Sequence, residues 1–163
     1  MQENTNQLKT VEIQFANAKL LPEIIRLLEE GHSVTLQLRG YSMRPFLEDN
    51  RDKALLIKAK DIQVGDPVLA EVSPLHYVLH RIIQTEDDKV VLRGDGNLGI
   101  ETCRLQDIKA SVVGFYRKGR QTLDRTDGKK WKIYSAIWTR LFPIRRYLLA
   151  AYRRIWIPLF GTM

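Results

Sequence analysis

The hexapeptide GYSMRP, residues 40–45, contains a serine two residues after the end of the alternating run VTLQLRG. A serine becomes a nucleophile when a base removes its proton and a hydrogen-bond donor receives the oxyanion. Gly40 permits an unusual backbone conformation and Pro45 stiffens the segment that follows, so Ser42 Oγ could be held out of a sheet. Serines are also common in turns, and a purely structural role for Ser42 is the alternative.

Four segments along the chain resemble, in order and spacing, the successive boxes of type I signal peptidases and the related self-cleaving repressor peptidases. They are GYSMRPFLEDNRDKALL, DIQVGDPVLAEV, YVLHRII and VVLRGDGN. The resemblance covers about residues 33–116. The Ser-Met-x-Pro box is matched by Ser42, Met43, Arg44 and Pro45, the GD-V box by Gly65, Asp66 and Val68, and the Gly-Asp-x-Asn turn by Gly94, Asp95 and Asn97.

The resemblance also implies a general base. Bacterial type I signal peptidases and the repressors have a lysine before the arginine of the third box, and here that position is His80, followed by Arg81. The chain therefore looks like the histidine branch, which includes the archaeal and endoplasmic-reticulum signal peptidases. Imidazole suits the role because it titrates near neutral pH without deep burial. We expect Arg81 to be structural and to pair with an acid.

Two acids are candidates for orienting the imidazole. Asp95 lies in the matched GDGN turn, and Glu101 follows six residues later, near a further aspartate of the histidine branch. The motif slightly favours Asp95, although an Asp-Gly pair also commonly caps its own turn. The oxyanion would be received mainly by the Ser42 N–H. Gly40 stands where some signal peptidases carry a serine donor, so a side-chain donor is missing.

The remaining chemically versatile residues have simpler interpretations. His76 could line the same cleft as His80, but a solvated strand start is the better interpretation, and His32 should lie at a helix end. Cys103 is expected to be a packed side chain. No HExxH motif or cysteine pair accompanies these residues, so we predict neither a metal site nor a cofactor.

The chain divides into a near-neutral body and a basic tail. Residues 1–116 carry 14 Lys and Arg against 17 Asp and Glu, a net charge of −3; residues 117–163 carry 12 against two, a net charge of +10. A single cysteine allows no internal disulfide, which fits a reducing compartment. The N-terminus lacks a secretory pattern, and no run approaches the roughly 20 apolar residues that span a bilayer.

Periodicity predicts a mainly β, antiparallel domain with an N-terminal helix and C-terminal amphipathic helices, α+β overall, and the resemblance implies that the β domain is of the signal-peptidase type. The pattern LLPEIIRLLEEG predicts a helix with Gly31 at its C-cap, and six short strands separated by turn signals follow. Pro143 should split the tail into two helices. The predicted regions are a helical lead (1–32), a catalytic domain (33–116), a solvated linker (117–130) and a basic aromatic helical tail (131–163).

These features predict a cytoplasmic serine endopeptidase that cleaves an extended leader, partner or self peptide. A non-catalytic peptide-binding or regulatory protein of the same fold is the alternative. Residues 131–160 could lie on an anionic membrane surface, at the inner face of the membrane, or pack on the body or a twin subunit instead. Nucleic acid is a weaker candidate partner, because no recognition motif accompanies the basic tail.

Overall fold

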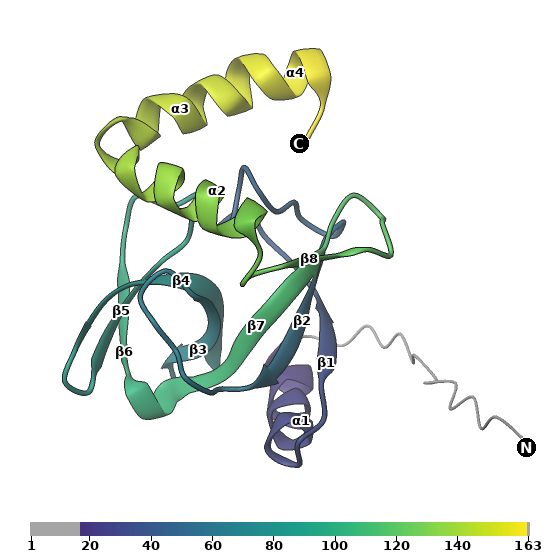
Figure 1. Cartoon of the computed structure of the whole chain (residues 1–163), viewed down its shortest axis with the longest axis vertical. Helices are drawn as coiled ribbons and strands as arrows, with labels where there is room; N and C mark the ends of the chain where they lie inside the picture. Colours follow the sequence, from purple (N-terminus) through teal and green to yellow (C-terminus); the bar gives the residue numbers. More distant parts are fainter. Residues whose placement is uncertain (1–16, 163) are drawn as a thin grey trace, which may run out of the picture.

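The computed structural model of the chain describes residues 17–162. Its centre is an antiparallel sheet of eight strands in the order β1-β2-β7-β3-β4-β5-β6, with β8 paired to β7 (Figure 1). The predicted mainly β domain with helices at both ends is confirmed. The strands are β1 (Val34–Gln37), β2 (Lys53–Lys58), β3 (Pro67–Ser73), β4 (His76–Glu86), β5 (Lys89–Arg93), β6 (Glu101–Arg104), β7 (Ile108–Tyr116) and β8 (Leu123–Arg125).

The sheet coils around two clusters of buried side chains. One cluster lies between α1 (Asn17–Glu29), β2 and β7, and Leu28, Leu56 and Phe115 are fully buried in it. The other lies between β3, β4, β5 and the start of β7; its members are Val68, Ala70, Ile82, Val90, Leu92 and Ile108. The loop that contains Ser42 joins β1 to β2 in the first half of the sheet, and the GDGN turn joins β5 to β6 in the other half.

The N-terminal helix α1 begins earlier than predicted, so Pro22 lies within the helix instead of at its first position. The chain leaves the helix as predicted at Gly31, which has a φ of +90°. The Gly31 N–H donates to the Leu28 carbonyl and the His32 N–H to the Leu27 carbonyl. This pair of bonds is the Schellman arrangement, in which glycine takes the left-handed position most readily.

The segment predicted to be a solvated linker contains the short strand β8. Leu123, Asp124 and Arg125 pair with Tyr116, Phe115 and Gly114 of β7. Gly114 permits this approach, because a Cβ at that position would lie 2.9 Å from the Asp124 carbonyl oxygen. The polar sequence RQTLDRTDG gives no apolar alternation, so its strand depends on pairing with β7 and not on local pattern.

Two helical arms follow β8. Helix α2 (Lys129–Arg140) lies against the body, and a 3₁₀ turn at Phe142–Ile144 contains the predicted break at Pro143. The second arm runs through α3 (Arg145–Ala151), a π-helical stretch (Tyr152–Trp156) and α4 (Ile157–Phe160). In Figure 1 this second arm extends above the sheet and α2. Within residues 17–162, no helix has the length and apolar character needed to span a membrane.

Candidate active site

The Ser42 loop joins β1 to β2 and is held at several points. Gly40 has a φ of +86°, and its N–H donates to Asp49 Oδ1 at 2.7 Å. Met43 and Pro45 are buried beneath the loop, whereas Ser42 is half-buried and Tyr41 is exposed. Buried neighbours on either side of a partly accessible serine fix the backbone while leaving its hydroxyl near the surface.

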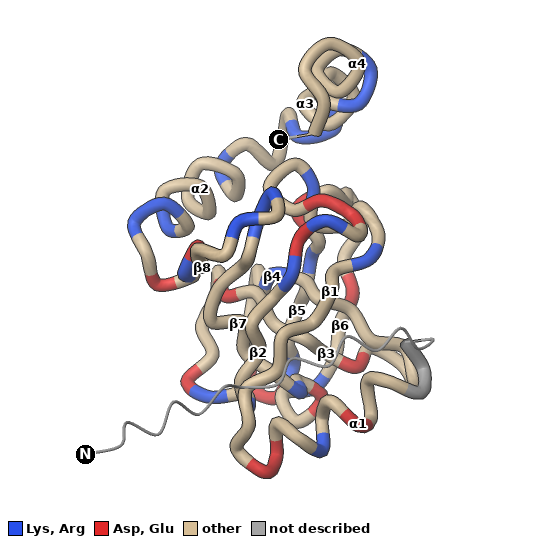
Figure 2. Tube along the Cα trace, turned by 90° about the vertical axis from the view of Figure 1, so that its right-hand side faces the viewer, with Lys and Arg blue, Asp and Glu red and all other residues tan. Residues whose placement is uncertain are grey.

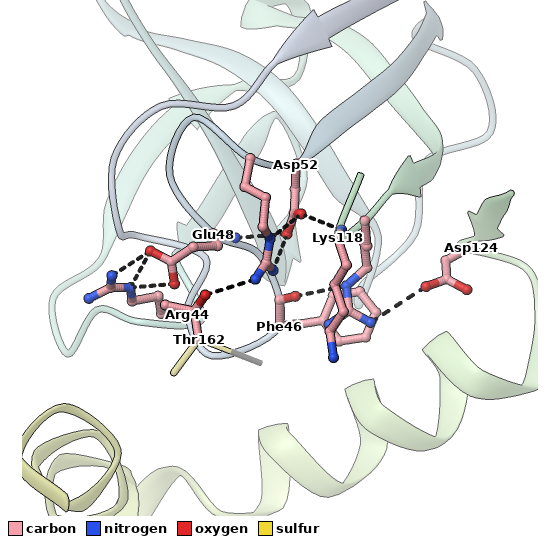
Figure 3. A network of polar contacts seen from close by, with 9 residues as sticks. Arg44, Phe46, Glu48, Asp52, Lys118, Asp124 and Thr162 are labelled. Carbon is pink, nitrogen blue, oxygen red and sulfur yellow. Dashed lines mark hydrogen bonds and ion pairs between the residues drawn. The ribbon is translucent and has the colours of Figure 1, made fainter. Parts of the chain in front are cut away.

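A polar network supports the far end of this loop (Figure 3). Asp52, which is fully buried, accepts hydrogen bonds from the Glu48 N–H, the Lys118 N–H and the Arg51 guanidinium. Arg117 donates to the Phe46 carbonyl at 2.9 Å. The loop is thereby connected to the end of β7, which anchors it to the sheet.

The GDGN turn packs directly on the Ser42 loop through backbone atoms. The Gly96 N–H donates to the Ser42 carbonyl at 2.7 Å. A Cβ on Gly94 would lie 2.4 Å from the Ser42 carbonyl oxygen, and one on Gly96 would lie 2.5 Å from the Tyr41 carbonyl oxygen. Both glycines are required because no side chain fits between the two loops.

His80 lies on β4 beside this contact and is 3% exposed. Its Nδ1 lies 3.0 Å from Oε2 of Glu101, the first residue of β6. Its Nε2 is directed towards Gly94, since a Cβ there would lie only 2.9 Å from this nitrogen. A carboxylate only accepts hydrogen bonds, so Nδ1 carries the proton and a neutral imidazole leaves Nε2 as an acceptor.

Burial lowers the pKa of His80 below the ordinary imidazole value, although the negative charge of Glu101 and its hydrogen bond oppose that shift. The net direction favours the neutral, basic form of the ring. Nε2 is thus prepared to accept a proton at neutral pH.

Ser42 and His80 are close to each other because the Ser42 carbonyl oxygen and His80 Nε2 both lie against Gly94. Among residues 17–162, no hydrogen bond joins Ser42 Oγ to the imidazole. Hydrogen bonds between a nucleophile and its base are often long in the free enzyme and tighten when substrate binds. The Ser42 N–H likewise donates to no group in that part of the chain, so it is available to an incoming oxygen.

Asp95, the acid that the motif favoured, does not contact His80 through a hydrogen bond. Its carboxylate accepts two hydrogen bonds from Arg81, at 3.0 and 2.7 Å, and one from the Tyr134 hydroxyl at 2.8 Å. Trp138 Nε1 donates to the Asp95 carbonyl at 2.9 Å. With 1% exposure and these partners, Asp95 is engaged in structure, while Glu101 is the acid beside the imidazole.

Arg81 has the predicted acidic partner and connects further segments. Its Nη1 donates to the Gly65 carbonyl at 2.9 Å and to the Ser135 hydroxyl. The guanidinium also lies over the Trp131 ring, 4.6 Å from the centroid. One buried arginine therefore joins the turn before β3, the GDGN turn and α2.

The aromatic face of α2 is the part of the site that sequence reasoning missed. Trp131 and Trp138 are buried, and Tyr134 stacks on Phe46 with the ring centroids 4.5 Å apart. Burial raises the pKa of the Tyr134 hydroxyl well above its usual range, and the Asp95 charge adds to that shift, so the hydroxyl remains a donor. The concentration of aromatic residues in the tail was the available signal.

The other candidate residues have structural positions. Asn97 lies in the GDGN turn. Its backbone N–H donates to the Gly94 carbonyl, and its side-chain Nδ2 is also close to Gly94. His76 is exposed at the start of β4, His32 is exposed after α1, and Cys103 is partly buried on β6. In the part of the chain that the structure describes, no three His, Cys, Asp or Glu side chains are grouped as metal ligands.

No protein-family model matches this chain, and no curated protein is significantly similar to it.

Proposed function

We propose that the protein is a serine endopeptidase in which Ser42 is the nucleophile, His80 the general base and Glu101 the acid that orients the imidazole. The observation that carries the proposal is that the Ser42 carbonyl oxygen and His80 Nε2 both lie against Gly94, with His80 Nδ1 bonded to Glu101. The three residues come from separate segments, the β1–β2 loop, β4 and β6. A turn serine with a purely structural role has no need of an oriented imidazole.

The geometry supports an acyl-transfer sequence. His80 Nε2 accepts the Ser42 proton as Oγ attacks the peptide carbonyl carbon, and the Ser42 N–H receives the developing oxyanion. The imidazolium, stabilised by Glu101, then donates that proton to the departing amine, leaving an acyl-enzyme. A water molecule, deprotonated by His80, hydrolyses the ester and restores the serine.

The substrate is proposed to be an extended peptide. Strand β1 ends just before Ser42 and, within residues 17–162, pairs only with β2, so its other edge has backbone groups for an added strand. Exposed apolar side chains of Tyr41, Leu98 and Ile100 flank the site. The resemblance to signal peptidases adds a small residue before the cleaved bond, and the peptide would be a leader, a partner or the chain itself.

The test is cleavage of a library of short peptides, read by mass spectrometry. Cleavage by the wild type that disappears in Ser42→Ala and in His80→Ala supports the proposal. His76→Ala is the matched control, because this exposed histidine lies four residues from His80 on the same strand. The His76→Ala protein should still cleave the peptides. Equal cleavage by Ser42→Ala and the wild type would overturn the assignment.

The second candidate function is a non-catalytic peptide-binding protein of the same fold. The missing hydrogen bond between Ser42 Oγ and His80, within the described residues, favours it. Peptides that bind the wild type and Ser42→Ala equally, and that neither protein cleaves at any pH, would favour binding over catalysis.

A further inference from the structure

The second helical arm, residues 144–160, exposes a row of large apolar side chains. Ile144, Tyr147, Ile155 and Leu159 are 48%, 66%, 60% and 69% exposed. Their spacing keeps them on one side of the helix. Trp156 and Phe160 are also exposed on this arm, with their ring centroids 4.8 Å apart. Six large apolar groups on one short arm form a surface that water solvates poorly.

The orientation of the arm is fixed by its buried side chains and by its end. Arg145, Leu149 and Tyr152 are buried, with exposed fractions of 4%, 3% and 6%. Arg145 Nη2 donates to the Trp138 carbonyl of α2 at 2.8 Å, and the end of the arm is tied to the body by the hydrogen bond from Arg51 to Thr162. The apolar row therefore faces away from the protein, contrary to the alternative in which it packs on the β domain.

The charge around the row has one sign. Residues 128–163 contain eight Lys and Arg and no Asp or Glu. Arg146, Arg153 and Arg154 are exposed on the same arm as the apolar row. The arm, which projects beyond the rest of the chain in Figure 2, carries its arginines in α3 and in the π-helical stretch that precedes α4. A surface of this kind complements an anionic, partly apolar partner.

We propose that the outer face of residues 144–160 docks on an anionic lipid surface. The apolar row and Trp156 would enter the interface between headgroups and acyl chains, and the arginines would pair with lipid phosphates. Nucleic acid would leave Ile155 and Leu159 without a function. A symmetric second copy would bring the arginines of both arms together, and their charges would repel.

The docking face consists of exposed residues of the second arm and does not include α2, whose residues Tyr134 and Trp138 donate hydrogen bonds to Asp95. Lipid binding would thus hold the Ser42 site at a membrane without contacting it. The inference does not depend on the proposed peptidase activity, because docking needs neither Ser42 nor His80.

The experiment is sedimentation of the full chain with vesicles of phosphatidylcholine alone or of phosphatidylcholine mixed with phosphatidylglycerol. The proposal requires binding to the anionic vesicles, weakened by salt, and little binding to the neutral ones. Tryptophan fluorescence should shift to shorter wavelength, and this shift should vanish in Trp156→Phe because Trp131 and Trp138 are already buried.

Variants distinguish the contribution of the arginines from that of the apolar row. Each of Arg153→Gln and Arg154→Gln should weaken binding about fivefold, and Ile155→Ser/Leu159→Ser should reduce it to the level of neutral vesicles. The matched control is Ile133→Ser/Ile137→Ser, which changes two exposed isoleucines of α2 and should bind normally. Urea unfolding and circular dichroism would verify that each variant is folded.

Three outcomes would overturn the proposal. They are no binding to anionic vesicles at low salt, equal loss in the α2 control, and a dimer in sedimentation velocity that Ile155→Ser/Leu159→Ser dissociates. The last result would identify a second copy as the occupant of the face.

Discussion

Gly94 touches the Ser42 carbonyl so closely that a single added methyl group would occupy the same space. The Cβ position of Gly94 lies 2.4 Å from that oxygen and 2.9 Å from His80 Nε2. Both neighbours are held, the first by the Gly96 N–H and the second by Glu101. The glycine therefore sets the separation between the serine loop and the imidazole.

Gly94→Ala should push the Ser42 loop away from His80. We expect peptide cleavage to fall by about 100-fold or more and the free energy of unfolding to fall by about 1–3 kcal/mol, as for overpacking. Peptidase assays and urea unfolding measure the two effects. Gly99→Ala is the control, since a Cβ there meets nothing within 4 Å. Full activity in Gly94→Ala would contradict the proposed arrangement.

Glu101→Gln should change both the rate and its pH dependence. Burial already lowers the pKa of His80, and the Glu101 charge opposes this shift. Cleavage by the wild type should rise with pH through a midpoint below about 6.5, the ordinary imidazole value, as His80 loses its proton. Without the carboxylate the midpoint should move lower still, and the plateau rate should fall by at least about 100-fold.

The measurement for Glu101 is kcat/KM against pH, which reports the pKa of the free enzyme. Glu86→Gln, an exposed change at the end of β4, should leave the profile unaltered. A lower rate with an unmoved midpoint would assign Glu101 a structural role only.

Local patterns predicted six of the eight strands, because turn residues separate apolar and alternating runs. They missed β6, with the sequence ETCR, because a four-residue polar strand depends on its pairing with β5. That pairing places Glu101 opposite Leu92, and this register brings Glu101 to His80. The choice between two acids close in sequence was therefore a question of long-range register, which composition and motif spacing do not contain.

The helical tail, residues 131–163, likewise depends on long-range contacts that its sequence pattern does not contain. Its aromatic content and the break at Pro143 were evident in the sequence, and residues 131–160 were considered there as a single surface. In the structure α2 packs on Arg81 and Asp95, whereas the second arm exposes its apolar row. The difference arises because Asp95 provides acceptors for α2, its carboxylate for the Tyr134 hydroxyl and its backbone carbonyl for Trp138 Nε1.

Asp95→Asn should mainly affect stability. The substitution removes the charge that pairs with the buried Arg81 guanidinium. Breaking a buried pair costs about 3–5 kcal/mol, since the remaining charge is uncompensated. Urea unfolding measures this loss, and Asp87→Asn, on an exposed turn, is the control. The pH midpoint of cleavage should move less than in Glu101→Gln. A larger shift in Asp95→Asn would make Asp95 the orienting acid.

Asp52 should make the fold sensitive to acid. Burial raises the pKa of this carboxyl, but hydrogen bonds from Arg51, the Lys118 N–H and the Glu48 N–H outweigh burial and leave it below the ordinary value (Figure 3). A lowered pKa in the folded state favours folding above about pH 4, the pKa of an unfolded aspartate. This contribution disappears as the pH falls through the lower, folded-state pKa.

Asp52→Asn should therefore lower the free energy of unfolding by about 3 kcal/mol at neutral pH and weaken its dependence on pH in the acid range. Urea unfolding at a series of pH values from neutral to acid tests both effects. Asp61→Asn is the control, because Asp61 is exposed and already has a φ of +47°, which asparagine accepts. If the variant and wild type lost stability in parallel as the pH fell, other carboxyl groups would be responsible for the acid sensitivity.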